Sequence, residues 1–203
     1  MKSSNCTALF AAAALSLAAC EKVTVAEDGN DAAAAPANGA VAANDQAHPA
    51  DPIESAMAAA PSSVAGNAKI VQAAADGSMK TLREGSNGWT CMPDNPTTPG
   101  PDPMCGDANA MAWAHAWMTK QTPPAETPGF MYMLAGGTDA SNTDPYAKAP
   151  TTENDWVETG PHVMVVGSSA ILKGYPSGAK PDTKAPYVMW AGTPYAHLMI
   201  PVQ

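Results

Sequence analysis

The chain is poor in basic side chains. Its 203 residues include 10 Lys and Arg against 19 Asp and Glu, so the formal net charge is −9. Proteins that bind nucleic acid neutralise phosphates with clustered Lys and Arg, and the sequence has no such cluster. We therefore expect no nucleic acid partner. The chain also has 20 Pro and 16 Gly, which argues against a bundle of long helices.

Several sequence signatures of chemistry are missing. The apolar run 8–19 has 12 residues, whereas a helix that spans a bilayer needs about 20. The sequence has no H-E-x-x-H, no phosphate-binding P-loop and no dinucleotide-binding glycine motif. The sequence therefore favours a protein that is not an enzyme, without deciding the matter.

The N-terminus has the features of a secretory signal. Lys2 precedes the apolar run, and small residues follow it, as in exported precursors. The segment Leu17-Ala18-Ala19-Cys20 resembles the lipobox of bacterial lipoproteins. That resemblance implies a signal peptide over 1–19, cleavage before Cys20 and acylation of its thiol and new amino group. The alternative is an ordinary secreted protein with a chance Cys at the cleavage site.

Lipidation would fix the location of the protein. Two or three acyl chains anchor a protein stably, which one chain does not. Glu21 rather than Asp follows the cysteine, and the resemblance to lipoproteins then favours the outer membrane, facing the periplasm, in a host that has one. The sequence thus predicts a cell-envelope protein whose membrane partner is reached through the lipid on Cys20.

Residues 20–66 are predicted to form a disordered tether. Between 21 and 66 the chain has 16 Ala, seven acidic residues and no aromatic residue. Such a composition buries too little apolar surface to offset the loss of chain entropy. The alternative is a small extra helix around 53–60.

Residues 67–203 are predicted to form one globular domain, since they hold 11 of the 12 aromatic residues. A helix is expected over 107–120, capped by Asp107 and ended before Pro123-Pro124. Strands are expected over 68–74, 79–84, 130–134, 162–166, 187–191 and 197–202, with a hairpin turn at Asp76-Gly77 between the first two. We predict an α+β fold with a mostly antiparallel sheet and one packed helix. A β-sandwich carrying one helix is the alternative.

Two cysteines remain for the domain, because Cys6 leaves with the signal and Cys20 is lipidated. Cys91 and Cys105 flank the Pro-rich segment 93–103. Their spacing differs from C-x-x-C, and no further Cys could complete a thiolate zinc site. In an oxidising compartment they are predicted to form a structural disulfide that closes this loop.

Four blocks of the domain carry a second resemblance: Gly88-Trp89-Thr90-Cys91-Met92-Pro93-Asp94, Pro103-Met104-Cys105, Thr159-Gly160-Pro161-His162-Val163-Met164 and Tyr187-Val188-Met189-Trp190-Ala191-Gly192-Thr193-Pro194-Tyr195. Together they resemble a group of bacterial secreted and envelope proteins to which no activity is assigned. The resemblance implies an exported domain and nothing about its chemistry.

Histidine and methionine form a repeated pattern. His162-Val163-Met164 and His197-Leu198-Met199 are H-x-M pairs in two predicted strands, and residues i and i+2 share a strand face. Imidazole and thioether ligands suit Cu(I). His115, between Met111 and Met118 on one stripe of the predicted helix, adds a third histidine. The alternative is that these methionines simply fill the core, in which case no cofactor is bound.

Three weaker patterns remain. The oxygen-rich segment 139–144 could bind Ca²⁺ or form Asx-turns. His162 and His197 could act as acid and base of a hydrolase or lyase, oriented by Asp94, Asp139 or Asp155. Tryptophans beside polar loops could bind a protein or a small molecule. The leading interpretation is an envelope lipoprotein whose domain binds or scaffolds a ligand.

Overall fold

The computed structural model describes residues 51–74, 78–98, 100–138 and 140–202. The lipobox and most of the predicted tether lie outside these residues, so the predicted signal peptide and the lipidation of Cys20 stay predictions. The turn expected at Asp76-Gly77 also lies outside them. Within the described residues, no helix has the length and apolarity needed to cross a membrane.

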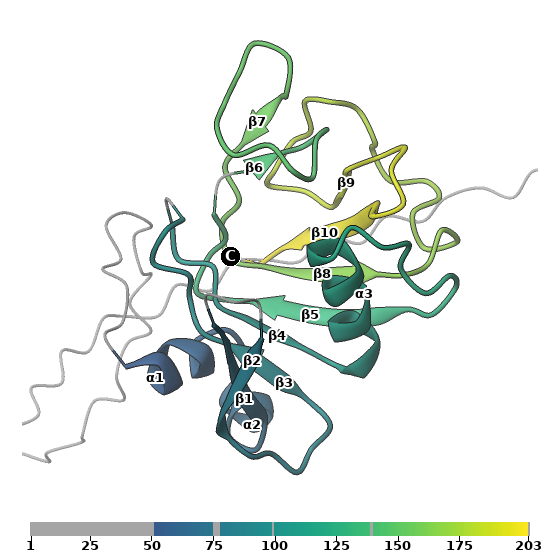
Figure 1. Ribbon diagram of the computed structural model, residues 1–203. Helices are drawn as coiled ribbons and strands as arrows, with labels where there is room; N and C mark the ends of the chain where they lie inside the picture. Colours follow the sequence, from purple (N-terminus) through teal and green to yellow (C-terminus); the bar gives the residue numbers. More distant parts are fainter. Residues whose placement is uncertain (1–50, 75–77, 99, 139, 203) are drawn as a thin grey trace, which may run out of the picture. The chain divides into compact units, whose positions relative to one another are not determined.

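The domain is built on an eight-stranded sheet with strand order β2-β1-β3-β4-β5-β8-β10-β9 (Figure 1). Its strands are β1 (Lys69–Ala73), β2 (Met79–Arg83), β3 (Thr90–Met92), β4 (Met104–Gly106), β5 (Gly129–Met133), β8 (His162–Val166), β9 (Tyr187–Met189) and β10 (His197–Pro201). β1 and β3 run parallel, and the other neighbours run antiparallel. The predicted α+β fold with a mostly antiparallel sheet is confirmed, and the β-sandwich alternative is not what forms. A separate pair, β6 (Ala140–Ser141) and β7 (Trp156–Val157), closes a long loop.

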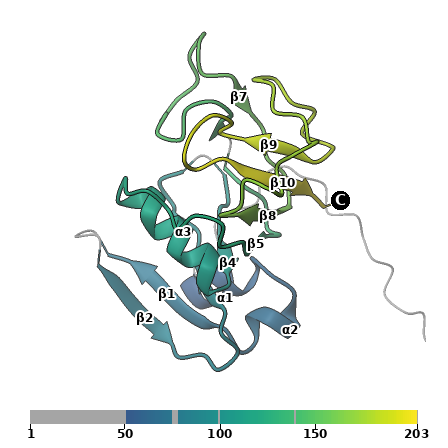
Figure 2. The ribbon, with the colours of Figure 1, turned by 90° about the vertical axis from the view of Figure 1, so that its right-hand side faces the viewer.

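Helix α3 (Ala108–Met118) matches the predicted helix. The Oδ1 atom of Asp107 accepts the Ala110 N–H at 2.8 Å, as an N-cap residue does. Figure 2 shows α3 beside the strands, and it packs on β4, β5 and β8. Its buried residues are Ala110, Trp113, Ala114 and Ala116. These side chains cover one face of the sheet.

The predicted boundary between tether and domain is wrong. Helices α1 (Pro52–Met57) and α2 (Ser62–Ala65) fall inside the range assigned to the tether, and the alternative of a small helix near 53–60 is closer to what forms. Ala56, Ala59 and Ala65 are fully buried against Ile70 and the Cys91–Cys105 disulfide. Alanine side chains are small enough to let helix backbones approach the sheet closely, and the partly buried Trp89 and Tyr132 also pack against this cluster.

The predicted disulfide is present. Cys91 on β3 and Cys105 on β4 occupy directly opposed positions and are bonded to each other. Both are fully buried in the cluster that α1 and α2 cover. The Pro-rich segment is therefore the connection between two paired strands, closed at its base by the disulfide.

Candidate functional site

The two H-x-M pairs lie on one face of neighbouring antiparallel strands. Met164 of β8 is directly opposite Met199 of β10, and His162 is opposite Pro201. His197 begins β10, four residues before Pro201. The thioethers therefore lie side by side, whereas the two histidines belong to opposite ends of the shared face.

His197 is a core residue between two indoles. It is 1% exposed, and its ring centroid lies 5.2 Å from that of Trp113 and 4.9 Å from that of Trp190. Its Nδ1 bonds to the Tyr195 carbonyl oxygen at 2.9 Å. Burial lowers the pKa of His197 to about 4; the Tyr195 carbonyl has a smaller raising effect, and the charge of His162 a further lowering one. The imidazole is therefore neutral and packs edge-on against both rings.

His115 lies apart from the other predicted ligands. It is exposed on α3, while the buried stripe of the helix carries Trp113. Of the five residues predicted as soft-metal ligands, the sheet brings together His162, Met164 and Met199. His197 is at the other end of the face and His115 is on the surface.

A cavity of about 200 Å³ opens at the His162 end of the shared face. Side chains of β8, β9 and β10 meet there, because Tyr187 is opposite Met199 in the register of β9 and β10. The cavity is lined by Glu158, Thr159, Gly160, Pro161, His162, Thr183, Lys184, Tyr187, Met199, Pro201 and Val202. The lining therefore includes the imidazole of His162, the phenol of Tyr187 and the thioether of Met199. It also includes one acidic residue, Glu158, and one basic residue, Lys184.

His162 is held in one tautomer. Its Nδ1 lies 2.7 Å from the Gly160 carbonyl oxygen. Since a carbonyl can only accept, Nδ1 carries the hydrogen and Nε2 keeps a lone pair in the neutral ring. Burial lowers the pKa of His162, against the smaller raising effect of the Gly160 carbonyl. A Cβ on Gly137 would stand 2.7 Å from Cε1 of this ring, so the glycine leaves room for the imidazole.

Tyr187 was not predicted as a site residue. It is 1% exposed, and its hydroxyl has no hydrogen-bond partner among the described residues. Burial raises the pKa of Tyr187 to about 12, so the hydroxyl stays protonated. In the sequence Tyr187 only begins an apolar strand, and no local signal links it to His162. The two residues come together because β10 pairs with β8, which carries His162, and with β9, which carries Tyr187.

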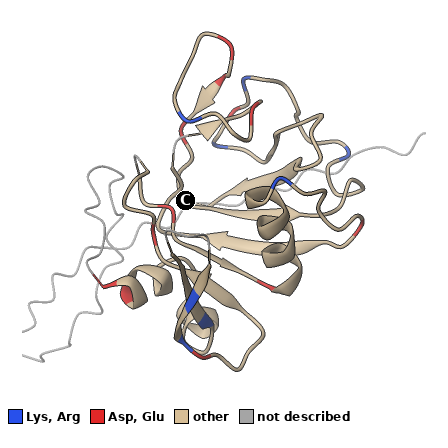
Figure 3. Cartoon of the chain, viewed as in Figure 1, with Lys and Arg blue, Asp and Glu red and all other residues tan. Residues whose placement is uncertain are grey.

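The strands around the cavity carry no charged side chains. Figure 3 shows Lys, Arg, Asp and Glu mainly on loops, on β2 and near the helix ends, while β5, β8, β9 and β10 are free of them. No group of three or more His, Cys, Asp or Glu among the described residues could hold a metal ion. Any metal bound at the cavity would therefore depend on methionine sulfur.

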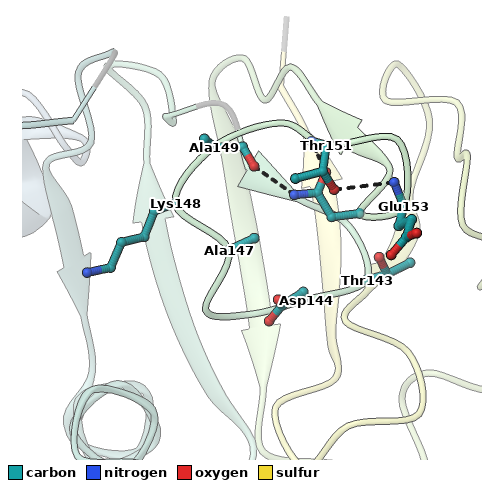
Figure 4. A pocket seen from close by; sticks show the side chains of 8 residues that line it. Thr143, Asp144, Ala147, Lys148, Ala149, Thr151 and Glu153 are labelled. Atoms are coloured by element: carbon teal, nitrogen blue, oxygen red, sulfur yellow. Dashed lines mark hydrogen bonds between the residues drawn. The ribbon is translucent and has the colours of Figure 1, made fainter.

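A second cavity, of about 460 Å³, lies in the loop between β6 and β7 (Figure 4). The Asn154 side chain braces this loop, donating to the Ala149 carbonyl at 2.7 Å and accepting the Thr151 N–H at 3.0 Å. Asp144 forms an Asx-turn with the Tyr146 N–H at 2.9 Å. Of the two expectations for 139–144, the turn is thus observed at Asp144, whereas Asp139 lies outside the described residues.

The predicted acid–base pair is not assembled. His162 borders a cavity, whereas His197 is enclosed by indoles. The Nδ1 atoms of both rings bond to backbone carbonyls, so the expected orientation by Asp94, Asp139 or Asp155 is not seen for these atoms. The geometry therefore favours binding over acid–base catalysis by this pair.

Comparison of the chain with protein-family models, with curated proteins and with solved structures finds no match.

Proposed function

We propose that the chain is a lipid-anchored protein of the cell envelope whose domain binds a small ligand in the His162 cavity. The observation that carries this proposal is the Tyr187 hydroxyl, which is buried and unpartnered among the described residues. A buried polar group without a partner costs about 1–3 kcal/mol. A ligand that bonds to this hydroxyl removes that cost, and the cavity supplies the space for it.

The cavity sets the size and chemistry of the ligand. Its volume of about 200 Å³ is below the roughly 300–1,000 Å³ of sites for drug-sized molecules. The ligand is therefore an ion or a molecule of few heavy atoms. His162 offers a lone pair at Nε2, Tyr187 a hydroxyl and Met199 a soft sulfur. Glu158 and Lys184 could neutralise a charge of either sign.

Two features support the envelope location. The lipobox-like segment ends at Cys20, and the domain has a buried Cys91–Cys105 disulfide, a bond typical of oxidising compartments. Cys20→Ser is expected to release the protein from the membrane fraction of its native cells. Cys6→Ser, the matched control, should leave it there. Membrane retention of Cys20→Ser would contradict anchoring.

The ligand is tested by native mass spectrometry of the protein extracted from its own membranes in mild detergent. Gly160 lines the cavity, and a Cβ on it meets no atom within 4 Å, so Gly160→Phe adds a ring near the cavity without an initial clash. Gly178 is equally open but does not line the cavity, so Gly178→Phe is the control. We expect a non-covalent mass on the wild type and on Gly178→Phe that is lost from Gly160→Phe. The same mass on all three, or on none, would overturn the proposal.

A further inference from the structure

We infer that the ligand of the His162 cavity is an uncharged molecule whose polar group both donates and accepts a hydrogen bond, as a hydroxyl or a carboxamide does. This group accepts from the Tyr187 hydroxyl and donates to Nε2 of His162. The inference rests on the proposed function, because it names the chemical class of the ligand in the same cavity. A bare soft metal ion, the ligand predicted from the H-x-M pairs, offers no acceptor to Tyr187.

Two unpaired polar groups border this cavity. Tyr187 is opposite Met199, and Met199 is opposite Met164, which follows His162 by two residues on β8. Residues related in this way share one face of the sheet. His162 is 4% exposed and Tyr187 is 1% exposed, and both line the cavity. Neither Nε2 of His162 nor the Tyr187 hydroxyl has a hydrogen-bond partner among the described residues.

The two groups have opposite hydrogen-bonding roles. Nδ1 of His162 donates to the Gly160 carbonyl at 2.7 Å, so Nε2 of the neutral ring can only accept. Burial lowers the pKa of His162, which keeps the ring neutral near pH 7. Burial also raises the pKa of Tyr187 to about 12, so its hydroxyl keeps a proton to donate. A ligand that satisfies both groups therefore presents a donor to His162 and an acceptor to Tyr187.

The charges at the cavity favour an uncharged polar group. The two charged lining residues, Glu158 and Lys184, are exposed and of opposite sign, whereas the buried His162 and Tyr187 are neutral. A carboxylate would bring a second acceptor against Nε2 of His162, and an ammonium ion has no acceptor for the Tyr187 proton. Burying an unpaired charge also costs far more than burying a neutral polar group. The part of the ligand that meets His162 and Tyr187 is therefore uncharged.

The rest of the lining favours a short hydrocarbon part on the ligand. The Thr159 hydroxyl donates to the Thr138 carbonyl at 2.9 Å, so its proton is already used. Buried and half-buried apolar side chains also line the cavity: Met199, Pro201 and Val202. Within a volume of about 200 Å³, the ligand is thus a small molecule with one polar end and a short apolar part.

The test is an NMR titration of the full chain in mild detergent with probes of nearly equal size: acetamide, 2-propanol, acetone and acetate. Acetamide and 2-propanol carry a donor and an acceptor, whereas acetone is a neutral acceptor and acetate a charged one. We expect acetamide or 2-propanol to cause saturable shifts of the His162 and Tyr187 ring signals. Acetone and acetate should bind at least about tenfold more weakly, because each leaves Nε2 of His162 unpaired. The tighter of the first two probes distinguishes a carboxamide from a hydroxyl.

Tyr187→Phe tests the hydroxyl by itself. It should weaken binding of the tighter probe at least about tenfold. It should also raise the melting temperature of the unliganded protein, because it removes a buried donor without a partner. Tyr195→Phe is the matched control, since Tyr195 is also buried but its hydroxyl donates to the Gln121 carbonyl at 3.0 Å. The control should lower the melting temperature and leave probe binding unchanged.

The ranking of the probes is measured on the parent chain and does not depend on the variants folding. Acetone or acetate binding as tightly as the other probes, or no saturable shift with any of them, would overturn the inference. A Tyr187→Phe variant that binds as tightly as the parent, or melts no higher than it, would overturn it too. If the native extract still shows a bound mass that Gly160→Phe loses, the cavity is a ligand site and only the chemistry assigned to its ligand has failed.

Discussion

Cys91 and Cys105 are opposed residues of adjacent antiparallel strands, and their disulfide closes the Pro-rich connection between β3 and β4. Both residues are fully buried beneath the alanines of α1 and α2. The bridge therefore restrains the unfolded chain and also lies within the smaller of the two hydrophobic clusters.

Removing the bridge is expected to destabilise the domain. The double variant Cys91→Ala/Cys105→Ala should lower the free energy of unfolding by about 3 kcal/mol, the loop-closure value for a loop of this length. Urea unfolding of both proteins in a Cys20→Ser background measures this change. An unchanged midpoint would show that the bridge contributes nothing to stability.

The Asp102 carboxyl is expected to lower the stability of the domain as pH rises from about 4 to about 6, against the opposite contribution of the buried His162 and His197, whose lowered pKa values make stability rise with pH. Asp94 Oδ1 accepts the Asp102 N–H at 2.8 Å, and Asp102 Oδ1 accepts the Asn95 N–H at 2.9 Å. Burial and the Asp94 carboxyl raise the pKa of Asp102 from 3.8 to about 6, against the lowering effect of Asn95. Between these values Asp102 is protonated more often in the folded chain than in the unfolded chain, so this group costs stability as the pH rises.

Asp102→Asn replaces the titrating carboxyl with a neutral amide. The amide oxygen can still accept the Asn95 N–H. We expect the contribution of this group between pH 4 and 6 to disappear and the melting temperature at pH 7 to rise by a few degrees. Asp182→Asn, on an exposed loop, is the control and should keep the parental pH profile. Thermal melts from pH 4 to 7 that are parallel for parent and Asp102→Asn would refute this account.

Gly137 is expected to be required for the position of His162. An alanine Cβ there would lie 2.5 Å from Thr159 Oγ1 and 2.7 Å from His162 Cε1, closer than packed atoms approach. Gly137→Ala should move the imidazole signals of His162 in NMR spectra and reduce the non-covalent mass that native mass spectrometry detects on the wild type. Gly160→Ala meets no atom within 4 Å and should change neither. If Gly137→Ala and Gly160→Ala behave alike, the His162 imidazole does not need the space that Gly137 leaves.

The folded region is expected to begin near residue 51 rather than 67. Ala56 is fully buried, whereas its neighbour Ala58 is exposed. Ala56→Glu should destabilise the domain by several kcal/mol, because a charge would be forced into an apolar cluster. Ala58→Glu should stay within about 0.5 kcal/mol of the parent. Limited proteolysis gives a second measurement: a resistant fragment that starts near 67 would contradict the role of α1 and α2.

Local patterns determined much of the fold. The predicted strand at 162–166 and the Asp107-capped helix form where the sequence placed them, because apolar patterning and an N-cap act within a few residues. The spacing of Cys91 and Cys105 likewise indicated the disulfide. The short strands β3, β4, β6 and β7 were missed, since two or three residues carry no periodicity and such strands form when a neighbour pairs with them.

The amino-acid sequence by itself determined the H-x-M pairs, the α+β class and the lipobox-like segment. Tertiary structure decided that Met164 faces Met199, that His197 is enclosed by indoles and that Tyr187 joins His162 at a cavity. It also turned an alanine-rich segment into helices that cover the disulfide. The physical reason is that strand order and register link residues far apart in the chain, and the close packing of small side chains depends on a partner surface that no local pattern records.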